Sequence, residues 1–194
     1  IEFVTLTHSI LEPNGLSIAT PVGTVLHTGD CKCDPNPLIG ETINEKKLKQ
    51  IGDKGVLAMI CDSTNVFSHG RAGSELDVRK SLLKIMETKQ KRVIVTSFAS
   101  NVARMESIFF CAKKTGRQIS LVGRSMYRIY KAAKQCGYLK NIQQPIDPRE
   151  AKKISRDKIV YLCTGSQGEP YGAMMRISNY IHPDVFIESG DTVI

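Results

Sequence analysis

The stretch RVIVTSFASNVARMESIFFCAKKTGRQISLVGRSMYRIYKAAKQ, residues 92–135, alternates short apolar runs with longer segments of mixed polarity. The runs at 92–96 and 118–122 are too short for typical helices and predict buried strands. The segments at 102–114 and 126–135 repeat apolar residues every three or four positions, which predicts helices. Strands that alternate with helices favour a mainly parallel sheet flanked by helices.

This alternation continues downstream, whereas the first third of the chain reads as short strands joined by turns. The run at 56–61 is continuously apolar and predicts a buried strand that ends in polar residues. Further predicted strands lie at 3–6, 16–20, 24–28, 158–163 and 185–188, and further helices at 75–88 and 171–180.

A glycine-containing stretch at 67–73 separates these two patterns, so we predict an α/β protein with parts at 1–74 and 75–194. The chain starts at Ile1 without a methionine and stops in the apolar phrase TVI at 192–194. We therefore expect it to be a piece of a longer protein.

Lys and Arg outnumber Asp and Glu by 27 to 19, which gives a net charge of +8 and favours RNA, DNA or anionic lipid as partners. An ordinary basic surface explains the charge as well, because these residues are spread along the chain. No run approaches the roughly 20 apolar residues of a membrane helix, so we expect no membrane insertion. The six cysteines form no C-x-x-C pair, which favours a reduced, cytoplasmic protein, with Cys61 and Cys163 as small hydrophobic residues in strands.

Two residues of metal-binding type follow predicted strands: His8 comes after the run at 3–6, and Asp30 after the strand at 24–28. An imidazole nitrogen and a bridging carboxylate are ligands that two-metal hydrolases use. Without further context, a capping histidine and a turn aspartate explain the pair better. Cys31 and Cys33, beside Asp30, we interpret as incidental.

Ser97, Ser100 and Asn101 lie between a predicted strand and a predicted helix. Hydroxyls and free N–H groups at a helix N-terminus suit an RNA phosphate, although Ser100 or Asn101 capping the helix fits equally. Another such turn, at 164–170, could bring the Gly165, Ser166 and Gln167 backbone close to sugar or phosphate.

Among the basic residues, Arg124 is a candidate phosphate ligand, as are Arg104 and Arg128, with solvation as the default for each. His27 we interpret as a strand residue near the site, and His69 and His182 as solvent-facing or capping. The glycine-rich turns alone would also fit a flavodoxin-like binder of small nucleotides.

Six phrases, read in order and spacing, resemble ribonuclease J-like nucleases of the metallo-β-lactamase/β-CASP family across essentially the whole chain. They are HSI at 8–10, TPVGTVLHTGD at 20–30, DSTN at 62–65, SFASNVAR at 97–104, GRSM at 123–126 and TGSQGEP at 164–170. The resemblance implies that residues 1–74 are the C-terminal part of a metallo-β-lactamase-like sandwich and that 75–194 are most of a β-CASP domain.

For individual residues, the resemblance implies that His8 and Asp30 are ligands of two divalent metal ions, with Asp30 bridging them. Zinc is the first expectation for these ions, and manganese or magnesium the alternatives. Asp62 matches a catalytic acidic position whose implied role is to orient a later histidine that assists the leaving group. Leu11 departs from the family's pattern, which has proline there, and this sequence delays the proline to Pro13.

For function, the resemblance implies an RNA hydrolase with endonuclease and 5′-to-3′ exonuclease activities that forms dimers or higher oligomers. The family's His-x-His-x-Asp-His phrase and its downstream histidines are absent from this chain, so we expect the chain alone to be inactive. Two alternatives stay open: a non-catalytic RNA-binding module, and a β-CASP nuclease acting on messenger RNA 3′ ends or on DNA.

Overall fold

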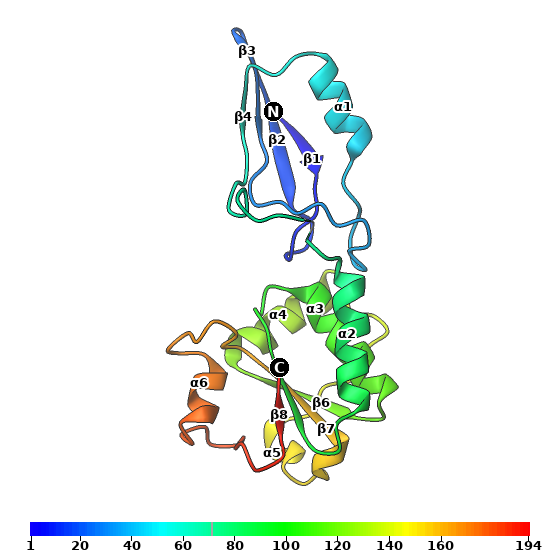
Figure 1. Cartoon of the computed structure of the whole chain (residues 1–194), viewed down its shortest axis with the longest axis vertical. Helices are drawn as coiled ribbons and strands as arrows, with labels where there is room; N and C mark the ends of the chain where they lie inside the picture. Colours follow the sequence, from blue (N-terminus) through cyan, green and yellow to red (C-terminus); the bar gives the residue numbers. More distant parts are fainter. Residues whose placement is uncertain (71) are drawn as a thin grey trace. The chain divides into compact units, whose positions relative to one another are not determined.

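The computed structural model describes residues 1–70 and 72–194 and divides the chain into two compact units, Ile1–Asp77 and Val78–Ile194 (Figure 1). We predicted the boundary at residue 74, and the observed division falls three residues later, after Asp77. It lies inside helix α2 (Glu75–Glu87). The predicted boundary stretch at 67–73 contains Arg71, which lies outside the described residues.

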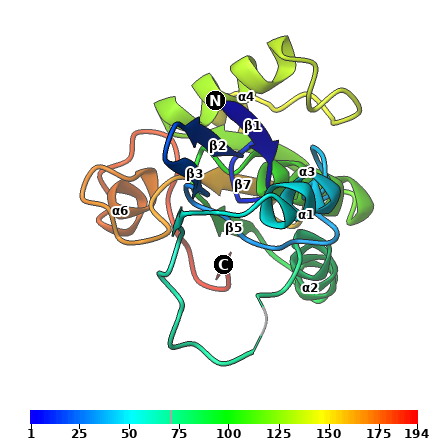
Figure 2. The ribbon, with the colours of Figure 1, turned by 90° about the horizontal axis from the view of Figure 1, so that it is seen from above.

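The first unit is built on a four-stranded sheet in the order β1-β2-β3-β4, and its first three strands lie side by side in Figure 2. Its elements are β1 (Glu2–Thr5), β2 (Asn14–Thr20), β3 (Gly23–His27), α1 (Glu45–Asp53) and β4 (Ala58–Ile60). The first three strands are antiparallel, while β4 runs parallel to β3 with Val25 opposite Ala58. Helix α1, which we did not predict, is capped by the Asn44 side chain and buries Ile51.

The prediction of a buried strand at 56–61 is wrong on burial. Strand β4 covers only Ala58–Ile60, and Leu57, Met59 and Ile60 are each more than half exposed. Within residues 1–70 and 72–194, β4 is the edge strand of this sheet and pairs with β3. Cys61 follows β4 and is exposed, so its interpretation as a small hydrophobic residue in a strand is also wrong.

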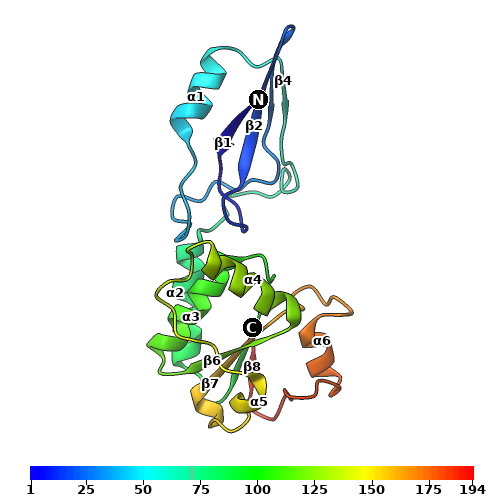
Figure 3. The same ribbon diagram turned by 180° about the vertical axis from the view of Figure 1, so that it is seen from behind.

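The second unit has the predicted parallel sheet, with strand order β6-β7-β5-β8 and helices packed on it (Figure 3). Besides α2, its elements are β5 (Val93–Thr96), α3 (Val102–Lys114), β6 (Gln118–Val122), α4 (Arg124–Gln135), α5 (Pro148–Ala151), a 3-10 turn η1 (Arg156–Lys158), β7 (Ile159–Cys163), α6 (Ala173–Ser178) and β8 (Thr192–Val193). None of the helices in the described residues is long and apolar enough to cross a membrane.

Strand β7 lies at the centre of the core, and all five of its residues are buried. Its alternate side chains, including Tyr161 and Cys163, pack with Ala173 and Ile177 from α6. The intervening residues are buried too, and α3 packs on β6 and β7. Burial on both faces explains why this strand reads as an uninterrupted apolar run.

The predicted strand at 185–188 is wrong: this segment is a loop that buries Val185 in the core. The last strand is instead β8, which pairs with β5. The predicted helix at 171–180 is shorter, at Ala173–Ser178.

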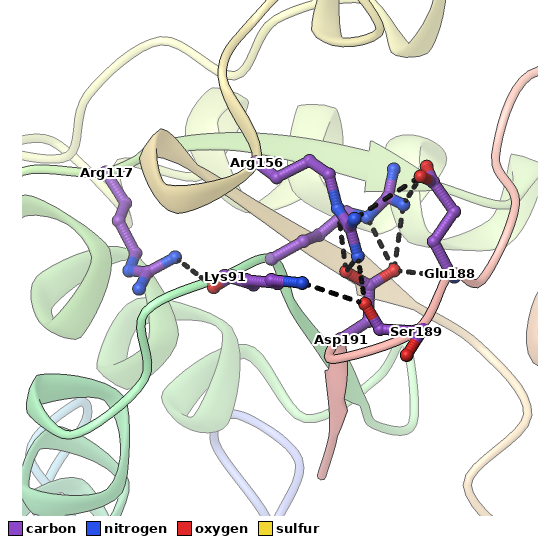
Figure 4. Close-up of polar contacts among 7 residues, drawn as sticks. Lys91, Arg117, Arg156, Glu188, Ser189 and Asp191 are labelled. Carbon is purple, nitrogen blue, oxygen red and sulfur yellow. Dashed lines mark hydrogen bonds and ion pairs between the residues drawn. The ribbon is translucent and has the colours of Figure 1, made fainter.

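A cluster of ion pairs fixes the loop before β8 (Figure 4). Arg92 contacts Asp191 at 2.8 Å and Glu188 at 2.7 Å, and Arg156 contacts Asp191 at 2.6 Å. Lys91 adds a hydrogen bond to the Ser189 carbonyl. The Asp191 side chain is fully buried, so this cluster holds the chain where Thr192 and Val193 can join the sheet.

Candidate functional site

The loops after β1, β3 and β4 are joined by hydrogen bonds at one end of the first sheet. The Lys32 N–H donates to the Thr7 carbonyl at 2.7 Å, and the Thr7 hydroxyl accepts from the Asp34 N–H at 3.1 Å. The Asp62 N–H donates to the Thr28 hydroxyl at 3.2 Å. The loops that carry the predicted residues of the first unit are therefore neighbours.

His8 is half-buried, and its Nδ1 lies 3.2 Å from the Ser9 hydroxyl. This contact leaves Nε2 as the nitrogen that can bind a ligand. Asp30 is exposed and follows Gly29, whose φ of 59° lies in the left-handed region that favours glycine. His27 ends β3, and its Nδ1 accepts from the Gly29 N–H at 3.0 Å, so it orders the turn before Asp30.

Asp62, the predicted catalytic residue, is held in its own turn. One carboxylate oxygen accepts from the Thr64 hydroxyl at 2.6 Å and from the Thr64 N–H at 2.9 Å. These hydrogen bonds, helped by the Cys31 backbone and the charge of His8, hold the pKa of Asp62 below its usual range. The held carboxylate of Asp62 is suited to accepting hydrogen bonds.

The His8 imidazole and the Asp30 carboxylate are suitable ligands for a divalent cation, but two ligands are too few for a complete metal site. Imidazole nitrogen and carboxylate oxygen are both zinc ligands, and a structural or catalytic zinc site uses three or four protein ligands. Across residues 1–70 and 72–194, no three His, Cys, Asp or Glu side chains gather where they could hold an ion. Cys31 and Cys33 form no disulfide.

The second unit has a hollow of about 310 Å³ at the carboxyl ends of its parallel strands. Ser97 follows β5, Ser125 lies in the first turn of α4 after β6, and Thr164 follows β7. The residues that line the hollow are Ser97, Phe98, Ala99, Ser125, Thr164, Gly165, Glu169, Pro170, Tyr171 and Gly172. Parallel α/β sheets place ligands at this edge.

Of the predicted substrate-binding residues, Ser97 and Gly165 line this hollow. The Ser97 N–H donates to the Cys163 carbonyl at 3.0 Å, which joins the ends of β5 and β7. The other predicted residues do not line it: Ser100, Ser166 and Gln167 are exposed in its flanking turns, and Arg124 is exposed at the start of α4.

Asn101 is a helix cap. Its side-chain oxygen accepts from the Arg104 N–H at 2.9 Å, and the residue is buried. The capping alternative is therefore confirmed for Asn101. His182 also caps its turn, because its Nδ1 accepts from the N–H groups of Asp184 and Val185.

Gly165, in the turn at 164–170, and Gly172, just after it, serve backbone packing. A Cβ on Gly165, whose φ is 114°, would lie 2.8 Å from the Cβ of Met174, and a Cβ on Gly172 would lie 2.6 Å from the Cα of Gly165. Glycine is thus needed where the turn packs against the start of α6, whether or not a ligand approaches.

Most residues of the hollow were not among the predicted substrate-binding residues, and three of these change its chemistry. Glu169 accepts from the Gln167 N–H at 3.0 Å, so a carboxylate occupies one donor that an anion would otherwise use. Phe98 and Tyr171 present aromatic surface, with Tyr171 98% exposed. Phe98 lies within one predicted turn and Tyr171 directly follows the other, and this position in the sequence could have identified both as site residues.

Comparisons with known proteins agree with the resemblance. The sequence model of the family "Ribonuclease J, beta-CASP domain" matches residues 90–194. The chain is 41% identical to a protein named Ribonuclease J from Sinorhizobium meliloti and 38% identical to one from Thermus thermophilus. In both cases all of this chain is covered but only 34% of the relative, so the chain spans about a third of their length.

A solved structure, of a protein of unknown function from Enterococcus faecalis V583, is also similar. The TM-score is 0.54 at 16% sequence identity, over 82% of this chain and 40% of that one. At this identity, the similarity concerns the fold alone.

Proposed function

We propose that this chain, which belongs to the ribonuclease J β-CASP family, is part of a metal-dependent ribonuclease that hydrolyses RNA phosphodiesters in RNA processing and decay. The observation that carries the proposal is similarity over all 194 residues to proteins named Ribonuclease J. The intact protein would act as an endonuclease and as a 5′-to-3′ exonuclease, in the cytoplasm, as a dimer or higher oligomer.

In the second unit, the hollow is proposed to receive the 5′ end of RNA. The Ser97 and Thr164 hydroxyls and the first turn of α4 line it, and hydroxyls and helix N-termini bind phosphate. The other predicted residues that flank or line the hollow remain candidate contacts of the RNA: Ser100, Asn101, Arg124, Gly165, Ser166 and Gln167. For Asn101 and Gly165, any such contact is additional to the structural roles described above.

In the first unit, His8 and Asp30 are proposed to bind metal, in the intact protein, together with ligands from outside this chain. Two divalent cations, zinc or alternatively manganese or magnesium, would supply an activated water and charge neutralisation on the phosphodiester. Asp62, as a carboxylate fixed by Thr64, would orient a histidine that assists the leaving group.

The test compares the intact protein with the 194-residue chain on a 5′-phosphorylated RNA and on DNA of the same sequence. We expect the intact protein to cleave the RNA until a chelator is added, Asp30→Ala to abolish cleavage, and the chain alone to be inactive. Chelator-sensitive cleavage by the chain alone would mean that the catalytic residues are misplaced, and cleavage of DNA only would favour another β-CASP nuclease.

A non-catalytic RNA-binding module is the second candidate for the chain itself, because its described residues hold no three-ligand metal cluster. RNA binding without cleavage by the intact protein, at any divalent metal, would favour that candidate.

A further inference from the structure

Helix α4 has four basic residues and no acidic residue in the sequence RSMYRIYKAAKQ. Arg124, Arg128, Lys131 and Lys134 are all exposed, and we call them the basic face of α4. At 100° per residue these four lie within one arc of the helix. The opposite arc carries Met126, Tyr130 and Ala133, which are buried.

In the part of the chain that the structure describes, no carboxylate forms an ion pair with this face. Two of the lysines instead contact aromatic rings: the Lys131 ammonium lies 4.7 Å from the centre of the Tyr127 ring, and that of Lys134 lies 5.7 Å from the centre of the Tyr130 ring. Tyr127 is 44% exposed, so aromatic surface is interleaved with positive charge.

This face begins at the hollow. Arg124 is the first residue of α4, and the next residue, Ser125, lines the hollow. From Arg124 to Gln135 the helix rises about 16 Å at 1.5 Å per residue. That length accommodates about five phosphates at the roughly 3.4 Å spacing of one stacked strand.

We propose that the basic face of α4 is a second RNA-binding surface, along which single-stranded RNA runs after its 5′ end enters the hollow. The proposal rests on the proposed function, because it assumes RNA in the hollow. Positive charge interleaved with aromatic rings is how proteins follow a single strand without reading its sequence. A lipid surface fits less well, because the apolar arc of α4 is buried in the protein and cannot enter a membrane.

The test uses the 194-residue chain and two 5′-phosphorylated RNAs, one of two nucleotides and one of about ten. The test variant combines Arg128→Gln, Lys131→Gln and Lys134→Gln. The matched control removes the same charge from exposed lysines of α2 and α3 by Lys80→Gln, Lys84→Gln and Lys113→Gln. A third variant keeps the charge of the face by exchanging its arginine and lysines, as Arg128→Lys, Lys131→Arg and Lys134→Arg.

Each phosphate of a single strand that the protein no longer neutralises makes the plot of log affinity against log salt shallower by about 0.7, so three make it shallower by about 2. Between about 50 and 200 mM salt, the unmodified chain should therefore lose about 20-fold more affinity for the longer RNA than the test variant does. The control and the charge-keeping variant should behave like the unmodified chain, and binding of the dinucleotide should be the same in all four.

If the test variant and the control showed the same salt dependence of affinity for the longer RNA, this proposal would be overturned while the proposed function stayed in place. Failure of the unmodified chain to bind either RNA would instead remove the RNA recognition that the proposed function assumes, and this proposal with it. If the substitutions abolished binding to phosphatidylserine vesicles but left RNA binding unchanged, the face would be a lipid-binding surface and the proposal wrong.

Discussion

Replacement of the buried carboxylate in the ion-pair cluster, Asp191→Asn, tests how β8 is held in the sheet. Asp191 contacts both Arg92 and Arg156, and its side chain is fully buried. The substitution keeps the shape of the side chain but removes its charge. Breaking a buried ion pair costs about 3 to 5 kcal/mol, and we expect about 3 kcal/mol because Glu188 still contacts both arginines.

The destabilisation should appear first at β8. The N–H groups of Thr192 and Ile194 donate to carbonyls of β5 and its flanking residue, and the Thr96 N–H donates to the Ile194 carbonyl at 2.7 Å. A cost of about 3 kcal/mol raises the opening equilibrium by roughly 100-fold. Hydrogen exchange at these three amides should accelerate by about that factor.

The pH dependence of the unfolding free energy provides an independent check on the role of Asp191. Burial alone raises the pKa of Asp191, but hydrogen bonds from Arg156 and Arg92 outweigh it and hold the pKa below its usual range. A lowered folded pKa stabilises the fold above the unfolded pKa of about 3.9, and this stabilisation is lost as the pH falls through the folded value. The difference in unfolding free energy between the two proteins should therefore shrink in acid.

Urea unfolding followed by circular dichroism measures that difference at each pH. The control is Glu150→Gln, which breaks an exposed pair with Lys153 and should cost less than about 0.5 kcal/mol. A difference for Asp191→Asn below about 1 kcal/mol at neutral pH, or one that does not change in acid, would refute the reasoning.

Three further predictions concern the second unit. Asn101→Ala should lower the unfolding free energy by about 1 kcal/mol, measured by urea titration, because the α3 cap is lost; Asn101→Asp should retain it. Gly165→Ala should destabilise the chain in thermal unfolding, since its Cβ would press on Met174 at a φ of 114°; an unchanged midpoint would contradict this. Burial raises the pKa of Cys163 to about 12, so iodoacetamide at neutral pH should modify exposed Cys33 and leave Cys163 intact, as mass spectrometry of peptides would show.

The candidate site was partly readable from sequence. The turns after β5 and β7 were identifiable because apolar runs end there in polar and glycine residues, and Ser97 and Gly165 line the hollow. Glu169 was not identified, because nothing local indicates that its carboxylate accepts from the Gln167 N–H. For His8, Asp30 and Asp62, the sequence supplied the residue types, and hydrogen bonds between their loops place those loops together.

The sequence by itself determined the family, the strands β5, β6 and β7, and the helices α2, α3 and α4. A run such as that of β7 is apolar throughout because both faces are covered, and the helical repeat of α4 is a local property of 12 residues. The family was identified from the order and spacing of six sequence motifs, which can be read without a structure.

Only the tertiary structure decided which apolar runs are buried and which become strands. The runs at β4 and at 185–188 were both predicted as strands, yet one is an exposed edge strand and the other a loop that buries Val185. Strand β8 pairs with β5 next to the contact between Arg92 and Asp191, which lie 99 residues apart along the chain. Burial and pairing depend on such distant partners, and a local pattern of hydrophobicity does not contain them.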